Sequence, residues 1–272
     1  MAVDMAGLVD DLAAESRDLE RILTGLPLAA WDTPTPSAGW LVRDQVSHLA
    51  YFDETATLSA TDAERFRRES ATLLAVGAEF ADHVAANHRS RLPGQLLDWM
   101  RRARQTYLDT FRALDPSTSL PWYGPPMSAA SSVTARLMET WAHGQDIADA
   151  VSATREPTGR LRHIAHLGVA TRGWSFRVHG LPLPDAQVRV ELAGPNGEIW
   201  TWGPPEAADR VSGSALDFCL LVTQRRHRSD TALRATGPVA DAWLGLAQAF
   251  AGPPGPGRGP QGIPVQQPSG GA

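Results

Sequence analysis

Apolar side chains recur at helical spacing through most of the first half of the chain. The first such stretch contains Leu8, Leu12 and Leu19 with charged residues between them, the pattern of an amphipathic helix. The predicted helices span residues 5–26, a segment that begins after Trp40, and residues 60–87, 93–114 and 131–152. Several amphipathic helices joined by short loops predict an antiparallel helical bundle.

The pattern changes after Arg155. Alternating apolar positions in residues 187–192 and 199–202, joined by the turn sequence Gly-Pro-Asn-Gly, predict a β-hairpin. Helices are predicted over residues 160–178, 214–224 and 239–250, with an extended piece at 233–235. The expected fold class is therefore α+β, with domains at residues 1–155 and 156–251. Residues 252–272 are rich in Gly and Pro and contain almost no large apolar side chains, so we predict a disordered tail.

Composition narrows the range of functions. The 272 residues are 43% hydrophobic and 20% charged, which is ordinary for a globular protein. Without an apolar run of eighteen residues or a signal-peptide pattern, we expect neither a membrane partner nor export. The net charge of −5 argues against nucleic-acid binding. The single cysteine, Cys219, cannot form an intrachain disulfide, which fits a cytoplasmic protein. All basic residues are arginines, so Schiff-base and P-loop lysine chemistry are excluded.

Three residues form a candidate metal site. Glu139 and His143 are four apart on one predicted helix and therefore share a face. His48 lies in an apolar context on another predicted helix. Two imidazoles and a carboxylate make a three-ligand site with an open coordination position, as in catalytic zinc centres. On spacing alone, such a Glu–His pair is usually a surface pair, and a single histidine on an apolar helix is more often a core residue.

Two sequence runs resemble a known family. Residues 39–50 (GWLVRDQVSHLA) and 136–149 (RLMETWAHGQDIAD) are similar to the two metal-ligand motifs of DinB-like proteins, particularly the actinobacterial group that includes mycothiol-dependent maleylpyruvate isomerase. The resemblance implies an N-terminal DinB-like antiparallel four-helix bundle and a smaller C-terminal α+β domain. It also implies a divalent metal, with zinc favoured, held by His48, Glu139 and His143.

Further site residues are expected near these ligands. Asp146, one turn after His143, is a candidate catalytic residue, or else a surface carboxylate. Asp44 is expected either to accept the second N–H of His48 or to stabilise its helix start. Arg136 is expected to pair with Asp146 or Glu139, or to be solvated.

Arginines in the second domain provide a candidate anion site. The resemblance implies a functional arginine there, and Arg225 occupies a similar place in the chain. We therefore predict that Arg225 is catalytic and that Arg225 and Arg226, with Arg228 nearby, bind a carboxylate of the cofactor. The alternative is that these side chains only complement a helix end.

The chain offers poor candidates for a nucleophile of its own. Cys219 lies in an apolar run and is expected in the core, and no Gly-x-Ser-x-Gly motif is present. Trp122 and Tyr123 are expected to line a pocket or to belong to a core or interface. The predicted function is a metal-dependent thiol S-transferase or isomerase. Its partners are mycothiol or a related low-molecular-weight thiol and an electrophilic small molecule, and the protein is expected to be a monomer or homodimer. A metal-hydroxide hydrolase without thiol and a non-catalytic metal-containing binding protein are the alternatives.

Overall fold

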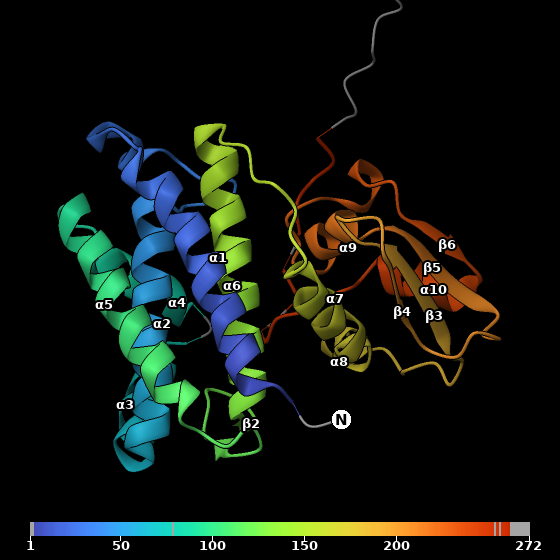
Figure 1. The fold of residues 1–272 in the computed structure, drawn as a ribbon, viewed down its shortest axis with the longest axis horizontal. Coiled ribbons are helices and arrows are strands. Elements are labelled where there is room, and N and C mark those ends of the chain that lie inside the picture. Colours follow the sequence, from blue (N-terminus) through green and yellow to red (C-terminus); the bar gives the residue numbers. More distant parts are fainter. Residues whose placement is uncertain (1–2, 78, 253, 256, 262–272) are drawn as a thin grey trace, which may run out of the picture. The chain divides into compact units, whose positions relative to one another are not determined.

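Four long helices dominate the first of two units in the computed structural model of the protein (Figure 1). The structure describes residues 3–261 except 78, 253 and 256. The chain divides into two compact units, Met1–Glu156 and Pro157–Ala272. The first is helical and the second contains a β-sheet, so the chain belongs to the α+β class, as its sequence predicts.

The first unit is built on α1 (Met5–Thr24), α2 (Val42–Thr61), α5 (Pro93–Arg112) and α6 (Ala129–Val151). Helix α2 packs against α5 and α6, and α1 packs against the same two helices. Their apolar faces meet in a core that includes Leu19, Leu23, Val46, Leu49, Leu96, Met100 and Ile147. This packing fixes the faces that α2 and α6 present to each other, which are the faces that carry the candidate site.

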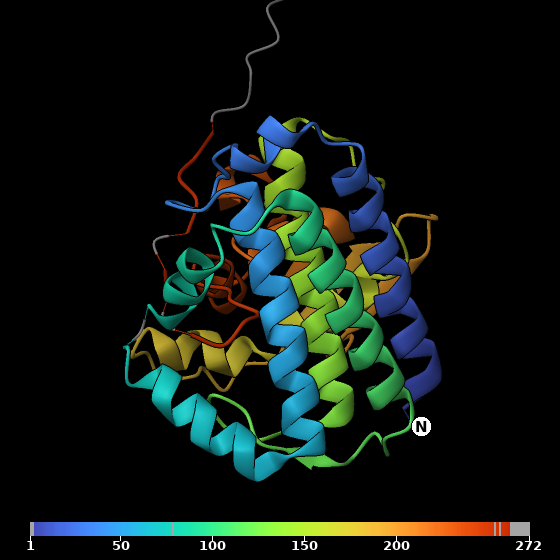
Figure 2. The ribbon, with the colours of Figure 1, turned by 90° about the vertical axis from the view of Figure 1, so that its left-hand side faces the viewer.

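The bundle contains both antiparallel and parallel neighbours. Helices α2 and α6 are antiparallel, because Gln45 pairs with His143 whereas the later Asp53 pairs with the earlier Arg136. Helices α2 and α5 instead run in the same direction, as Figure 2 shows. The antiparallel prediction is therefore wrong for α2 and α5, because the α3–α4 segment carries the chain back before α5 begins.

The connection between α2 and α5 corrects another prediction. The single helix expected over residues 60–87 is two helices, α3 (Ala63–Leu74) and α4 (Phe80–Asn87). Asp62 separates α2 from α3 by accepting a hydrogen bond from the Arg65 N–H as an N-cap. Gly77, with a φ of 108°, lies between α3 and α4 in a conformation that favours glycine.

Shorter elements complete the first unit. A 3-10 helix, η1 (Leu28–Asp32), follows α1, and a small antiparallel pair, β1 (Ser119–Leu120) and β2 (Met127–Ser128), precedes α6. Ser128 is the N-cap that precedes α6, and its side chain accepts a hydrogen bond from the Ser131 N–H at 3.1 Å. This N-cap sets the start of the helix that carries Glu139 and His143.

A four-stranded sheet of order β4-β3-β5-β6 forms the centre of the second unit's described residues. Strands β3 (Val188–Ala193) and β4 (Ile199–Trp202) make the predicted antiparallel hairpin. Strand β5 (Asp209–Ser214), which the sequence pattern does not predict, pairs parallel to β3 and antiparallel to β6 (Arg234–Thr236). The other elements are α7 (Leu161–Ala170), α8 (Arg172–Val178), α9 (Ala215–Val222), η2 (Arg228–Asp230) and α10 (Pro238–Leu244).

Two helix predictions in this unit are wrong in detail. The helix expected over residues 160–178 is interrupted at Thr171, which ends α7 and precedes α8. The helix expected over 239–250 ends at Leu244, where Gly245 caps it. Within the described residues, none of the helices is long and apolar enough to cross a membrane. The predicted tail, residues 252–272, lies largely outside the described residues; within its described part, the Gln261 N–H donates to the Asp230 carboxylate.

Candidate metal centre

His48 on α2 and Glu139 and His143 on α6 converge on one point. Each offers one ligand atom, and the three atoms lie within 4.8 Å of one another. Glu139 Oε2 is 3.0 Å from His143 Nε2 and 3.5 Å from His48 Nε2. The i, i+4 spacing places Glu139 and His143 one turn apart, and the antiparallel packing of α2 brings His48 to the same level. The three residues named from the sequence are therefore brought together.

The cluster is enclosed on most sides but remains accessible. The side chains of His48 and His143 are each 11% exposed, and that of Glu139 is 25% exposed. Such a site excludes most water yet leaves an edge through which a small ligand can approach. Catalytic zinc sites bind water or substrate at a fourth position, and the partial exposure of this cluster is compatible with that arrangement.

The electrostatics of the cluster favour the ligand forms of two of its members. Burial and the nearby His143 lower the pKa of His48 from 6.5 to about 3. Burial by itself raises the pKa of Glu139, but hydrogen bonds and charge interactions with His143 and His48 outweigh it and hold that pKa well below 4.5. At neutral pH His48 is therefore neutral and Glu139 is ionised, as metal coordination requires.

Aromatic rings surround the two histidines. The Trp40 ring lies 5.3 Å from His48 and 5.9 Å from His143, nearly parallel to the latter at 19°. Phe52, one turn after His48 on α2, lies 4.6 Å from it. Trp40 Nε1 donates to Asp82 on α4, which fixes the indole over the site. These rings supply an apolar wall that sequence analysis did not assign.

Trp122 and Tyr123 extend the same aromatic group. Tyr123 lies 5.6 Å from Phe52 and 5.3 Å from Phe80, and Trp122 stacks on Phe66 at 5.9 Å. They are therefore one aromatic layer away from His48. Both residues pack within the helical unit, and both border Phe52, the residue that touches His48.

Arg136 is paired differently from the expectation. Its Nε donates to Asp53 at 2.9 Å and its Nη2 to the Leu49 carbonyl oxygen at 3.1 Å. Arg104 on α5 donates to the other oxygen of Asp53 at 2.6 Å. Asp53 is completely buried, so one carboxylate is shared between two buried guanidinium groups. This triad joins α2, α5 and α6 and thereby holds the helices that carry the ligands.

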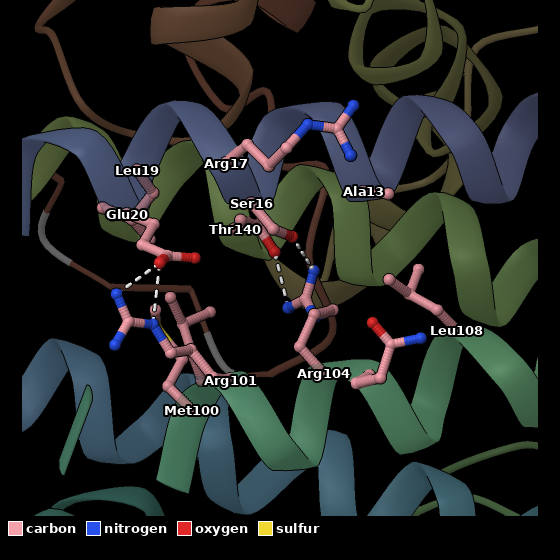
Figure 3. A pocket seen from close by; sticks show the side chains of 12 residues that line it. Ala13, Ser16, Arg17, Leu19, Glu20, Met100, Arg101, Arg104, Leu108 and Thr140 are labelled. Atoms are coloured by element: carbon pink, nitrogen blue, oxygen red, sulfur yellow. Dashed lines mark hydrogen bonds and ion pairs between the residues drawn. The ribbon is translucent and has the colours of Figure 1, made fainter. Parts of the chain in front are cut away.

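A separate cavity of about 290 Å³ lies among α1, α2, α5 and α6. Its lining includes Ser16, Arg104 and Thr140, and Arg104 donates to both hydroxyl groups (Figure 3). Leu49 and Thr140 line it, whereas their sequence neighbours His48 and Glu139 do not. The cavity therefore reflects the packing around Arg104 and is not the candidate metal centre.

Two carboxylates near the ligands have other partners. The Arg89 guanidinium donates to both oxygens of Asp44, and the Leu41 N–H donates to one of them, so Asp44 stabilises the start of α2. The prediction that Asp44 accepts the second N–H of His48 is wrong, because Nδ1 of His48 has no hydrogen-bond partner among the described residues. Asp146 is buried and accepts a hydrogen bond from Ser37 Oγ at 3.0 Å. Its catalytic role stays a prediction.

The candidate anion site lies in the second unit. Arg225 donates to the Thr223 carbonyl oxygen at 2.7 Å, and Arg226 donates to that of Arg225 at 2.8 Å. Arg228 forms an ion pair with Asp241. The binding and catalytic roles of Arg225 and Arg226 stay predictions. Cys219 is buried, and burial raises the pKa of its thiol, which confirms that it is a core residue.

The fold and the cluster define a DinB-like protein with a two-histidine, one-carboxylate site. The family described as mycothiol maleylpyruvate isomerase N-terminal domain matches residues 12–148, half of the chain, and the chain belongs to this family. Two uncharacterized proteins from two strains of Mycobacterium tuberculosis are each 48% identical to it over 255 residues, covering 94% of this chain and 99% of theirs.

Solved structures support the same fold. Two crystal structures of mycothiol-dependent maleylpyruvate isomerase, one of them a mutant, match with TM-scores of 0.57 and 0.59. Each is 16% identical in sequence, and the match covers 86% of this chain and 93% of theirs. A further family, described as wyosine base formation, matches residues 184–236 only. The likeness to the solved structures spans most of the chain and concerns its fold.

Proposed function

We propose that the protein is a metal-dependent enzyme that uses mycothiol or a related low-molecular-weight thiol in S-transfer or isomerisation. The observation that carries this proposal is the convergence of one ligand atom each from His48, Glu139 and His143 within 4.8 Å. Membership of the mycothiol maleylpyruvate isomerase family supports the thiol. Zinc is the proposed metal, because two imidazoles, one carboxylate and an open position are typical of catalytic zinc sites.

The charge of the site supports an anionic co-substrate. Two neutral imidazoles and one carboxylate leave a divalent ion with a single net positive charge. When bound, such a metal acts as a Lewis acid that lowers the pKa of a coordinated thiol and stabilises the thiolate. The protein itself offers no accessible thiol among its residues, because its single cysteine is buried. The thiol must therefore come from solution.

The protein's own groups then have distinct tasks. His48, Glu139 and His143 hold the metal, and the rings of Trp40 and Phe52 limit the access of water to it. We assign Asp146 to holding a proton, or to accepting a hydrogen bond from the substrate, next to His143. We assign Arg225 and Arg226 to binding a carboxylate of the thiol cofactor. A guanidinium suits that task because it can donate two parallel hydrogen bonds to one carboxylate.

The proposed reaction begins with transfer of the thiol proton to water, which later returns a proton where the product needs one. The thiolate sulfur adds to an electrophilic carbon of the substrate and forms a C–S bond. In isomerisation, the adduct rotates about a carbon–carbon bond, the C–S bond breaks and the thiolate is released. In S-transfer, the adduct takes up a proton on carbon and leaves as the thioether product. The two outcomes share the first step and differ in whether the C–S bond breaks again.

Metal analysis combined with a thiol-adduct screen tests the proposal. The purified protein is expected to bind one equivalent of zinc and to form thiol adducts or isomers from a panel of electrophilic alkenes. Chelation should abolish turnover and zinc should restore it. The His48→Ala variant is expected to lose zinc and activity, whereas His83→Ala, which changes an exposed histidine of the same unit, should retain both.

Three outcomes would contradict the proposal. Full turnover after verified metal removal would exclude metal dependence. Turnover that is independent of added thiol would favour the metal-hydroxide hydrolase. A zinc-loaded protein that binds no thiol by calorimetry would favour a non-catalytic binding protein.

A further inference from the structure

A series of hydrogen bonds between buried polar groups ends at Nδ1 of His143, the ring nitrogen that points away from Glu139. His143 Nδ1 pairs with Gln45 Oε1, and Gln45 Nε2 donates to Thr35 Oγ1 at 2.9 Å. Thr35 Oγ1 in turn donates to the Trp40 carbonyl oxygen at 2.9 Å. Gln45 is completely buried and Thr35 is 9% exposed, so water does not compete for these bonds. These hydrogen bonds connect the loop before α2 to His143, a candidate ligand on α6.

The loop that holds Thr35 is itself well fixed. Pro34 and Leu41 form an antiparallel bridge, and the Thr35 N–H donates to the Trp40 carbonyl oxygen at 2.7 Å. Both the backbone and the side chain of Thr35 are thus bound to the same carbonyl group. The hydroxyl group that meets Gln45 therefore has a defined position.

The direction of each hydrogen bond follows from the chemistry of the groups. Carbonyl oxygens only accept, so the single hydroxyl proton of Thr35 points to a backbone carbonyl group. Thr35 Oγ1 must then accept from Gln45, which places the NH₂ group of the Gln45 amide toward Thr35. The amide oxygen consequently faces His143, and Nδ1 of His143 must carry the proton. In the neutral ring this leaves the lone pair on Nε2, the nitrogen that faces Glu139.

His48 is held in another way. Its Nδ1 is buried and has no hydrogen-bond partner within the described part of the chain. The ring is instead packed between Trp40 and Phe52, with centroids 5.3 Å and 4.6 Å away. A hydrogen bond therefore fixes the tautomer of His143, whereas the described residues provide no such bond to Nδ1 of His48. The two imidazoles of the cluster are positioned by different forces.

We propose that Gln45, fixed by Thr35, is a positioning residue that keeps Nε2 of His143 directed at the metal as its coordinating atom. This inference rests on the proposed metal centre and assigns roles to residues outside it. Hydrogen bonds to the non-coordinating nitrogen of a ligating histidine fix its tautomer and orientation, and their loss weakens metal affinity about 10- to 100-fold.

Zinc affinity, measured by competition with a chromophoric chelator, tests this assignment. Gln45→Met preserves the length of the side chain but removes the acceptor, and zinc binding is expected to weaken about 10- to 100-fold. Gln45→Glu retains an oxygen toward Nδ1 and is expected to stay close to the wild-type affinity. Thr35→Val removes the hydroxyl group that orients the Gln45 amide and is expected to weaken zinc binding. Thr35→Ser keeps this hydroxyl group and should retain the wild-type affinity.

A matched control and a second readout separate positioning from general damage. Ser47 is buried on the same helix, and its hydroxyl donates to the Asp44 carbonyl oxygen and to no other group in the described part of the chain. Ser47→Ala should therefore leave zinc affinity unchanged. Nitrogen-15 NMR of the zinc-loaded protein should show a protonated Nδ1 and a coordinated Nε2 for His143. This signature should be lost or mixed in Gln45→Met and Thr35→Val.

The possible results are distinct. If Gln45→Met and Thr35→Val bind zinc as tightly as Ser47→Ala, the positioning role is wrong although the metal centre stands. If Gln45→Met does not fold, the comparison of Thr35→Val with Thr35→Ser decides. If the wild-type protein binds no zinc, the metal centre itself is wrong, and the inference fails with it.

Discussion

Arg136 on α6 and Asp53 on α2 form an ion pair that is shielded from solvent, with Nε 2.9 Å from Oδ1. The side chain of Asp53 is 0% exposed and that of Arg136 is 4% exposed. Arg136 lies one turn before Glu139 and Asp53 follows His48 on α2, so the pair joins the two ligand-bearing helices beside the cluster. The ion pair therefore helps to fix the positions of α2 and α6, and with them the spacing of His48 and Glu139.

Removal of the shared carboxylate is therefore expected to destabilise the first unit. In Asp53→Ala, the buried guanidinium groups of Arg104 and Arg136 both lose their ionised partner. Breaking a buried ion pair costs about 3–5 kcal/mol because a charge remains without compensation. We expect a loss of at least this size in the free energy of unfolding, measured by urea denaturation.

An exposed ion pair provides the matched control for this prediction. Glu69 pairs with Arg65 at 2.7 Å on α3, and both side chains are more than half exposed. Exposed pairs contribute about 0–1 kcal/mol, so Glu69→Ala should change stability little. Equal effects of Asp53→Ala and Glu69→Ala would contradict the structural role of the buried carboxylate.

The pKa of His48 predicts acid sensitivity of the metal-free protein. Burial and the nearby His143 lower that pKa from 6.5 in the unfolded chain to about 3 in the fold. Between these values the unfolded state binds more protons than the folded state, so stability falls as the pH is lowered. The contribution of His48 is complete above pH 6.5 and is lost toward pH 3, at no more than about 1.4 kcal/mol per pH unit.

Comparison with His48→Gln isolates this contribution. The two metal-free proteins should differ in the pH dependence of their urea midpoints between 6.5 and 4.5, where Glu139, with its lowered pKa, remains ionised. Groups that do not contact His48, such as His88 with its lowered pKa, are common to both proteins and cancel. Identical slopes in this window would show that His48 is not held neutral by its surroundings.

The candidate metal ligands could be predicted from the sequence, whereas the residues that support them could not. Glu139 and His143 are linked by local helical spacing, and motif resemblance added His48. Gln45 and Arg104 act on residues that are 98 and 51 positions away, and no local pattern links such partners. The visible signal was indirect: polar side chains lie at core positions of apolar helices, where a buried polar group needs a partner.

The same limit explains the strand that the sequence did not reveal. Residues 209–214 (DRVSGS) contain one large apolar residue and a glycine, so they lack the composition of an isolated strand. In the fold this segment pairs with β3 on one side and β6 on the other. Its conformation is therefore stabilised by neighbours in the sheet, whereas the β3–β4 hairpin carries its own turn signal.

Trp40 provides a test of how packing positions the histidines. Its ring stacks on His143 at 5.9 Å and approaches His48 at 5.3 Å. Aromatic pairs contribute about 0.5–1.5 kcal/mol beyond their buried area, so Trp40→Ala should weaken zinc binding roughly 2- to 10-fold. Trp40→Phe, which keeps a ring, should recover part of the affinity in the same chelator competition. An unchanged zinc affinity in Trp40→Ala would show that the indole only covers the site.

The charge of Glu139 allows a last, isosteric test. In Glu139→Gln the side chain keeps its shape but no longer offers an anionic oxygen to the metal, and a divalent ion there would carry two uncompensated charges. Because a carboxamide is a weaker ligand than a carboxylate, we expect zinc affinity to fall by about tenfold or more. Loss of a residue that only hydrogen-bonds to a metal ligand already weakens metal affinity by about this factor.

The matched control changes a carboxylate of the same unit that takes no part in the cluster. Glu20 pairs with Arg101 on the surface at 2.5 Å, so Glu20→Gln should leave zinc affinity unchanged. At saturating zinc, thiol binding by calorimetry separates the tasks of Glu139: retained thiol affinity in Glu139→Gln is expected if its carboxylate only holds the metal. Unchanged zinc affinity in this variant would remove Glu139 from the ligand set and leave the two histidines to bind metal without it.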